Sequence, residues 1–146
     1  MARLLFVTGT PADVRSGSGT FVGISVLRSA LEAAGHQVDV VAPARGRAMP
    51  TLPGRLLFNI GIRSQAAEMA PGADAVVGFD LDGLFLRRGA NANHVAALKG
   101  VLADEARFER GAAALRLRAE AFLEKFHVRR ADRVIATSAH SARRVV

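Results

Sequence analysis

Residues 131–138 read Ala-Asp-Arg-Val-Ile-Ala-Thr-Ser, and this stretch decides the fold. The arginine-rich residues before it end a helical segment, residues 133–137 are predicted to form a short buried strand, and Ser138 is placed to cap the next helix. A strand between two helices is the repeating unit of an α/β fold. Because the chain closes on such a unit, we expect it to be the front half of a two-domain protein.

The preceding residues repeat this alternation of short apolar strands and helical segments. Four more strands are predicted, at residues 3–8, 37–42, 74–79 and 93–98. Helices are predicted at residues 21–34, 55–69 and 104–130, the last with apolar positions Leu115, Ala119, Phe122 and Phe126 and a candidate break at Gly111. Residues 44–54 are expected to form an exposed loop, and residues 80–86 a short helix or turn. This order predicts the α/β class, with a Rossmann-like parallel sheet and helices on both faces.

The composition limits the kinds of protein that the chain can be. With 146 residues, half of them apolar, it can form one domain with its own core. The absence of cysteine excludes disulfides and thiolate metal sites and fits a cytoplasmic setting. The net charge of +7 comes almost entirely from arginine and favours anionic partners. Because Trp and Tyr are missing, base stacking would fall to Phe alone, and nucleic acid is disfavoured as a partner.

A glycine-bearing loop stands between the first strand and the first helix, and it reads Ser16-Gly17-Ser18-Gly19-Thr20. Glycines let backbone amides approach an anion at a helix N-terminus. The candidates for binding a diphosphate are therefore Gly17, Ser18, Gly19 and Thr20. The alternative is a plain loop followed by an ordinary helix cap. A P-loop is excluded because no lysine follows Gly19, and a dinucleotide fingerprint because residues 9–15 separate the glycines from the strand.

Several polar residues follow the predicted strands at the edge where parallel α/β sheets bind their ligands. Lys99 comes directly after the strand at residues 93–98. A lone lysine at this edge of the sheet favours a role in a functional site. Asp104 and Glu105 can bind hydroxyl groups of a substrate, or can serve only the first turn of a helix. Asp80 and Asp82 follow the strand at residues 74–79, and helix capping is the favoured use of one of them.

The histidines and serines give no further catalytic constellation. His36 is predicted to lie in a tight turn, His94 to pack within a strand, and His127 to serve as a cation near a helix end, while a site role stays open for His140. No set of His, Asp and Glu has metal-ligand spacing, so no metal site is predicted. No Gly-x-Ser-x-Gly elbow is present, which leaves an esterase without its nucleophile.

In their order, these features resemble the N-terminal domain of GT-B glycosyltransferases, specifically the large retaining family four. The resemblance rests on the opening strand, the glycine loop, residues 31–38, the strand end Val41-Ala42-Pro43, and residues 131–138. Residues 99–111, Lys-Gly-Val-Leu-Ala-Asp-Glu-Ala-Arg-Phe-Glu-Arg-Gly, look like the signature of a subgroup. The resemblance covers the whole chain.

The resemblance implies transfer of a hexose, with retention, from a nucleotide-sugar to an acceptor hydroxyl, without a metal or another cofactor. Residues 1–146 would be the acceptor-side domain, and a C-terminal domain absent from this chain would bind most of the donor, so this domain alone would be inactive. The catalytic candidates are then Lys99, Asp104 and Glu105. Many members carry His where this chain has Lys99, but a lysine can also donate to a sugar hydroxyl or neutralise a leaving diphosphate.

The resemblance also implies partners and a location. We expect a carbohydrate or lipid-linked acceptor, a cytoplasmic protein, and contact with the inner face of the membrane through Arg107, Arg110, Arg116 and Arg118, unless these arginines form only a solvated face. An apolar interdomain face would favour self-association of the isolated domain. The alternative function is a non-catalytic α/β module that binds a sugar, a phosphate or a protein.

Overall fold

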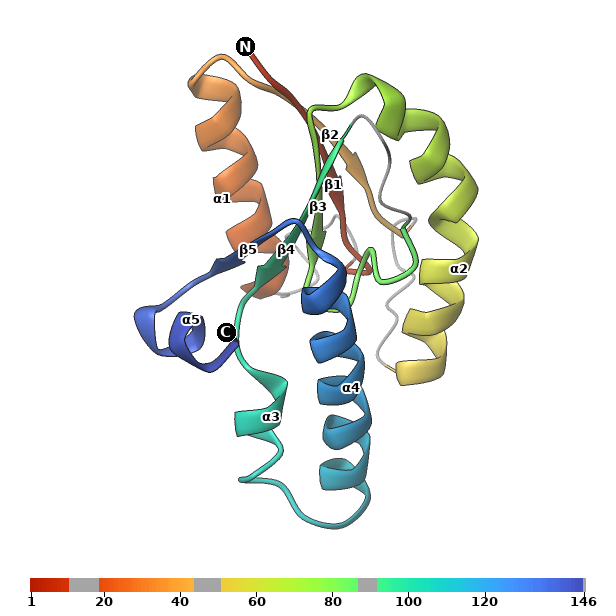
Figure 1. The fold of residues 1–146 in the computed structure, drawn as a ribbon, viewed down its shortest axis with the longest axis vertical. Helices are drawn as coiled ribbons and strands as arrows, with labels where there is room; N and C mark the ends of the chain where they lie inside the picture. Colours follow the sequence, from red (N-terminus) through yellow and green to blue (C-terminus); the bar gives the residue numbers. More distant parts are fainter. Residues whose placement is uncertain (11–18, 44–50, 87–91, 146) are drawn as a thin grey trace.

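The computed structural model describes residues 1–10, 19–43, 51–86 and 92–145. These residues form a five-stranded parallel sheet with the strand order β2-β1-β3-β4-β5 (Figure 1). The strands are β1 (Arg3–Val7), β2 (Gln37–Val41), β3 (Ala75–Phe79), β4 (Asn93–Leu98) and β5 (Arg133–Ala136). Each one begins and ends within one residue of its predicted position, and the predicted α/β class is confirmed.

Helices cover both faces of the sheet, as predicted (Figure 1). α1 (Gly19–Ala33) lies on one face, and α2 (Leu52–Met69) with its short 3-10 continuation η2 (Ala70–Gly72) lies on the other, which α4 (Gly111–Arg130) shares. Two shorter helices, α3 (Leu102–Glu105) and α5 (Ala139–Val145), follow the carboxyl ends of β4 and β5. In the described part of the chain, no helix combines the length and the apolar character needed to cross a lipid bilayer.

The core consists of two apolar clusters, one on each face of the sheet. Successive residues of a strand point to opposite faces, so Phe6 packs toward α1 and its neighbour Leu5 toward α2. On the α1 side the rings of Phe6 and Phe79 meet edge to face with 5.1 Å between centroids. On the α2 side Phe58 and Ile62 close the cluster. The apolar strands are thus buried on both faces, which explains why they read as continuous apolar runs.

Two predicted helices have different limits in the structure. α2 begins at Leu52 rather than at residue 55, because the hydroxyl of Thr51 accepts a hydrogen bond from the amide of Gly54 (3.2 Å) and caps the helix. Residues 51–54 are therefore not part of the expected loop, and residues 44–50 lie outside the described residues. The predicted helix at 104–130 is two helices, α3 and α4, and Gly111, with φ of 61°, starts the second.

Candidate functional site

The strand order places a topological switch point at the carboxyl edge of the sheet. β1 lies between β2 and β3, so the chain reverses its winding direction there. Ligands of open α/β sheets bind at such a switch point. Thr8 and Gly9 follow β1, and residues 80–84 form a turn after β3. These segments form the first side of the candidate site.

The buried carboxylate of Asp82 holds the two loops together. It accepts hydrogen bonds from the backbone amide of Gly9 (2.5 Å) and from the guanidinium of Arg55 on α2 (3.0 Å), and the side-chain amide of Asn59 lies 3.5 Å away. Burial raises the pKa of Asp82, and Arg55 and the Gly9 amide oppose that shift. Asp82 therefore joins three segments, and the prediction that Asp80 or Asp82 caps a helix is wrong, because the turn that follows β3 is not a helix.

Lys99 lies at the carboxyl end of β4, where the sequence placed it, and Asp80 fixes it there. The ammonium of Lys99 is 2.6 Å from one carboxylate oxygen of Asp80, and its backbone amide donates to the other (3.1 Å). The hydroxyl of Thr137, which follows β5, donates to the carbonyl of Lys99 (2.8 Å). About a third of the Lys99 side chain stays exposed (34%), so the ammonium is both positioned and accessible to a ligand.

The other two predicted catalytic residues point to different places. The carboxylate of Glu105 lies against Gly100, since a Cβ at that glycine would be 2.7 Å from Oε1 of Glu105. Glu105 thus belongs with Lys99 at the end of β4. Asp104 instead faces a neighbouring pocket of about 610 Å³ between α3 and α5. The structure therefore places Glu105 beside Gly100, the residue after Lys99, and Asp104 in the second pocket.

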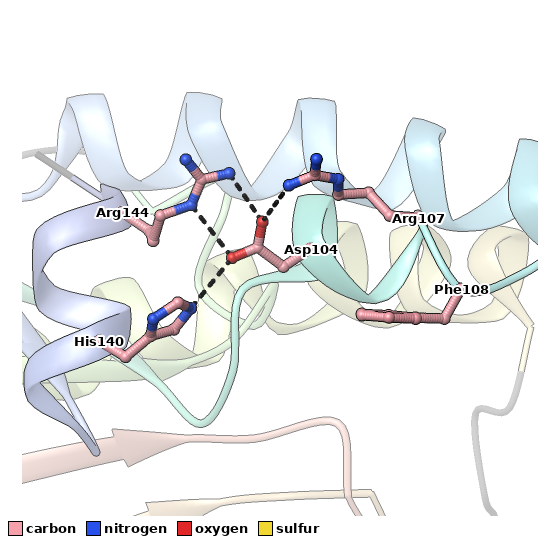
Figure 2. Close-up of a pocket in the computed structure, with 5 residues that line it drawn as sticks. All are labelled: Asp104, Arg107, Phe108, His140 and Arg144. Atoms are coloured by element: carbon pink, nitrogen blue, oxygen red, sulfur yellow. Dashed lines mark hydrogen bonds and ion pairs between the residues drawn. The ribbon is translucent and has the colours of Figure 1, made fainter.

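Figure 2 shows this second pocket, in which two arginines and the ring of His140 converge on Asp104. Arg144 makes two hydrogen bonds to the carboxylate (2.7 and 3.1 Å), His140 approaches to 3.4 Å, and Arg107 to 3.9 Å. Hydrogen bonding by Arg144 lowers the pKa of Asp104. Two guanidinium groups facing one carboxylate leave a surplus of positive charge, and the exposed ring of Phe108 adds an apolar wall. The pocket suits an anionic group such as a phosphate or carboxylate.

Two buried residues of α4 at this edge were missed as site residues in the sequence. Glu124 accepts from the backbone amide of Leu102 (3.3 Å), and burial, with help from Asp80 and Glu105, raises its pKa to about 7. A carboxyl group with such a pKa can exchange a proton near neutral pH. The signal was the helical spacing of Glu120, Glu124 and His127, which places three polar residues on one side of α4.

His127 is not a helix-end cation, so that prediction is wrong. Its ring is fully buried, and burial lowers its pKa. Nδ1 lies 2.7 Å from the carbonyl oxygen of Asp80 and must donate to it, while Nε2 lies 3.1 Å from Nε2 of His94. Only one proton fits between the two rings, so a neutral His127 accepts from His94. This chain of hydrogen bonds supports Asp80 and, through it, Lys99.

The raised pKa of Glu124 predicts how stability depends on pH. Because the folded-state pKa of about 7 exceeds the ordinary value of 4.5, the stabilising contribution is complete below 4.5 and is lost as pH rises through about 7. Glu124→Gln stays neutral and can still accept from Leu102. We expect the variant to melt at a higher temperature than the wild type at about pH 8.5, and at the same temperature near pH 4.5.

Thermal unfolding of both proteins across this pH range is the measurement. His127 contributes in the opposite direction, since its lowered pKa removes stability as pH falls below its ordinary value. That contribution is common to the two proteins and cancels in their difference. A difference in melting temperature that does not change with pH would show that Glu124 titrates as an ordinary glutamate.

Two expectations from the sequence remain, the diphosphate contact at the glycine loop and the lack of a metal site. Gly17 and Ser18 lie outside the described residues, whereas Gly19 and Thr20 form the start of α1. The predicted diphosphate contact at this loop stays a prediction. Among residues 1–10, 19–43, 51–86 and 92–145, no three His, Asp or Glu side chains gather in a way that would hold a metal ion.

No known protein family, no curated protein and no solved structure matches the chain. The residues at the carboxyl edge of the sheet therefore indicate what the chain can do chemically. Those residues are Asp80, Lys99, Glu105 and Glu124, together with the Asp104 pocket.

Proposed function

We propose that the chain is the acceptor-side domain of a retaining GT-B glycosyltransferase. In this proposal a second α/β domain, outside these 146 residues, binds the nucleotide-sugar, and the hexose is transferred across the cleft between the two domains. The observation that carries the proposal is the pair of Lys99 and Asp80 at the carboxyl end of β4. The segment that resembles the family's subgroup signature begins at that lysine.

The geometry suggests a task for each group in this proposal. Lys99 is a fixed, accessible cation that can neutralise the departing diphosphate or donate to a hydroxyl of the sugar. Glu105, beside Gly100, can accept a hydrogen bond from an acceptor hydroxyl. The positively charged Asp104 pocket can take an anionic group of the acceptor. The mechanism needs electrostatic stabilisation and positioning of the two sugars, and no metal.

The two lysines of the chain provide a matched test. Lys99→Ala removes the cation at the end of β4, and Lys125→Ala removes an equal charge from the exposed surface of α4. We expect Lys99→Ala to lower kcat/KM by about a hundredfold, the effect of losing one group that stabilises developing negative charge. Lys125→Ala is expected to retain the wild-type value with carbohydrate acceptors that are not linked to a lipid.

The measurement is transfer of labelled hexose from UDP- and GDP-hexoses to carbohydrate and lipid-linked acceptors by the full-length gene product. Calorimetric titration with the same donors and acceptors separates binding from transfer. Saturable binding of a sugar or phosphate without any transfer would show that the protein is a non-catalytic binding module rather than an enzyme. Transfer that is equally fast with Lys99→Ala would refute the assignment of this lysine.

A further inference from the structure

α4 buries three ionisable side chains and exposes three large apolar ones. The side chains that face the sheet and α3 include Glu120, Glu124 and His127, all of them buried. The apolar residues Leu115, Phe122 and Phe126 are exposed, at 70%, 71% and 41%. A helix that packs on a sheet normally shows the opposite arrangement. The outward face of α4 is therefore built to contact something other than water.

The three exposed apolar residues form one continuous stripe. Phe122 follows Leu115 by seven residues and Phe126 follows Phe122 by four, which places them above one another on the same side of the helix. The guanidinium of Arg130 stacks over the Phe126 ring, 5.1 Å from its centroid. In Figure 1, α4 runs along the outside of the molecule to its lower end. We call this stripe the apolar ridge of α4.

The charges beside this stripe have one sign. Both acidic residues of α4 are buried, and every exposed charge on the helix is a cation. These cations are Arg116, Arg118, Lys125, Arg129 and Arg130. An apolar ridge between cations is the pattern of a helix that lies in the surface of a membrane.

The same charges decide between possible occupants of the ridge. A second copy of the chain would bring one set of cations against another, which repel. A protein partner would need an acidic surface that also accommodates three apolar side chains. A bilayer with anionic headgroups supplies negative charge and an apolar layer at once, and its fluid surface adapts to the helix.

We propose that α4 is a membrane-surface helix that binds anionic bilayers, with Leu115, Phe122 and Phe126 inserted among the lipids and the cations on the headgroups. This inference does not depend on the proposed enzymatic function. It also differs from the expectation drawn from the sequence, because the contact depends on the apolar ridge rather than on Arg107 and Arg110.

The composition of the chain makes a direct experiment simple. The protein has no Trp and no Tyr, so Phe122→Trp introduces a single reporter of tryptophan fluorescence. On vesicles of phosphatidylcholine mixed with phosphatidylglycerol, we expect its emission to shift to shorter wavelength. The shift should be absent with phosphatidylcholine alone and should weaken as salt is added, because the headgroup attraction is screened.

A matched control comes from α2, where Leu57 is also 70% exposed. Leu57→Trp is expected to show no shift on either vesicle. In a separate co-sedimentation experiment, Leu115→Ser should weaken binding to anionic vesicles by about tenfold, while Leu57→Ser should leave it unchanged. Because both leucines are exposed, neither substitution removes a core contact, and circular dichroism verifies that each variant is folded.

Three results would overturn the proposal. The reporter at position 122 could keep its emission wavelength on anionic vesicles. Leu115→Ser and Leu57→Ser could bind vesicles equally well. The emission could shift on self-association of the protein or on addition of poly-glutamate but not on vesicles, and the ridge would then be a site for a second copy or for an acidic protein.

Discussion

Replacing Gly78 by alanine is expected to lower the free energy of unfolding by about 3 kcal/mol or more. Gly78 lies in β3 below the turn at residues 80–84, and a Cβ there would overlap the backbone carbonyl oxygen of Asp82. It would also come within 3.1 Å of Cε1 of His127. A backbone atom cannot rotate away as a side chain can, so the whole turn must move. That movement would displace Asp80 and release Lys99.

Urea unfolding measures this effect, and Gly61→Ala provides the control. Gly61 is an exposed residue in the middle of α2, and a Cβ there meets nothing within 4 Å. Alanine is the better helix former, so this control should raise the free energy of unfolding by about 1 kcal/mol. The same chemical change thus has opposite signs at the two positions. A Gly78→Ala protein as stable as the wild type would mean that the turn does not pack against β3.

Asp82→Ala is expected to cost about 3 kcal/mol of stability, the second largest effect. The substitution leaves the buried amide of Gly9 without its acceptor and the guanidinium of Arg55 without its carboxylate. An unsatisfied buried donor alone costs about 1–3 kcal/mol. Because Gly9 lies at the switch point of the sheet, binding of any ligand there should weaken together with stability.

Two further variants separate the hydrogen bonds from the charge. Asp82→Asn keeps an acceptor for Gly9 and removes the charge, so it should cost less than Asp82→Ala. Arg55→Met should also cost less, because burial already raises the pKa of Asp82 and favours its neutral form once the arginine is gone. Urea unfolding of the three variants gives the ranking. If Asp82→Ala costs no more than Asp82→Asn, the contact with Gly9 contributes nothing.

The position of Lys99 was predictable because it depends on one boundary only. Residues 93–98 form a strand of the parallel sheet, so the next residue must lie at the ligand edge. The partner of Lys99 was not predictable in the same way, since Asp80 precedes it by 19 residues and follows another strand. Glu124 and His127 were missed for this reason too. Their contacts join α4 to Leu102 and Asp80, which are 22 and 47 residues away.

The sequence by itself determined the five strands, the order of helices between them and the α/β class. Each strand is a short apolar run with strand-breaking residues at its ends. Such local signals can be recognised without knowledge of the rest of the chain. Only the tertiary structure decided which side of α4 is buried. Periodicity locates a polar and an apolar side, but the neighbours choose between them. Here they offer the Asp80 carbonyl, the Leu102 amide and the His94 ring, so the side that carries Glu124 and His127 faces inward.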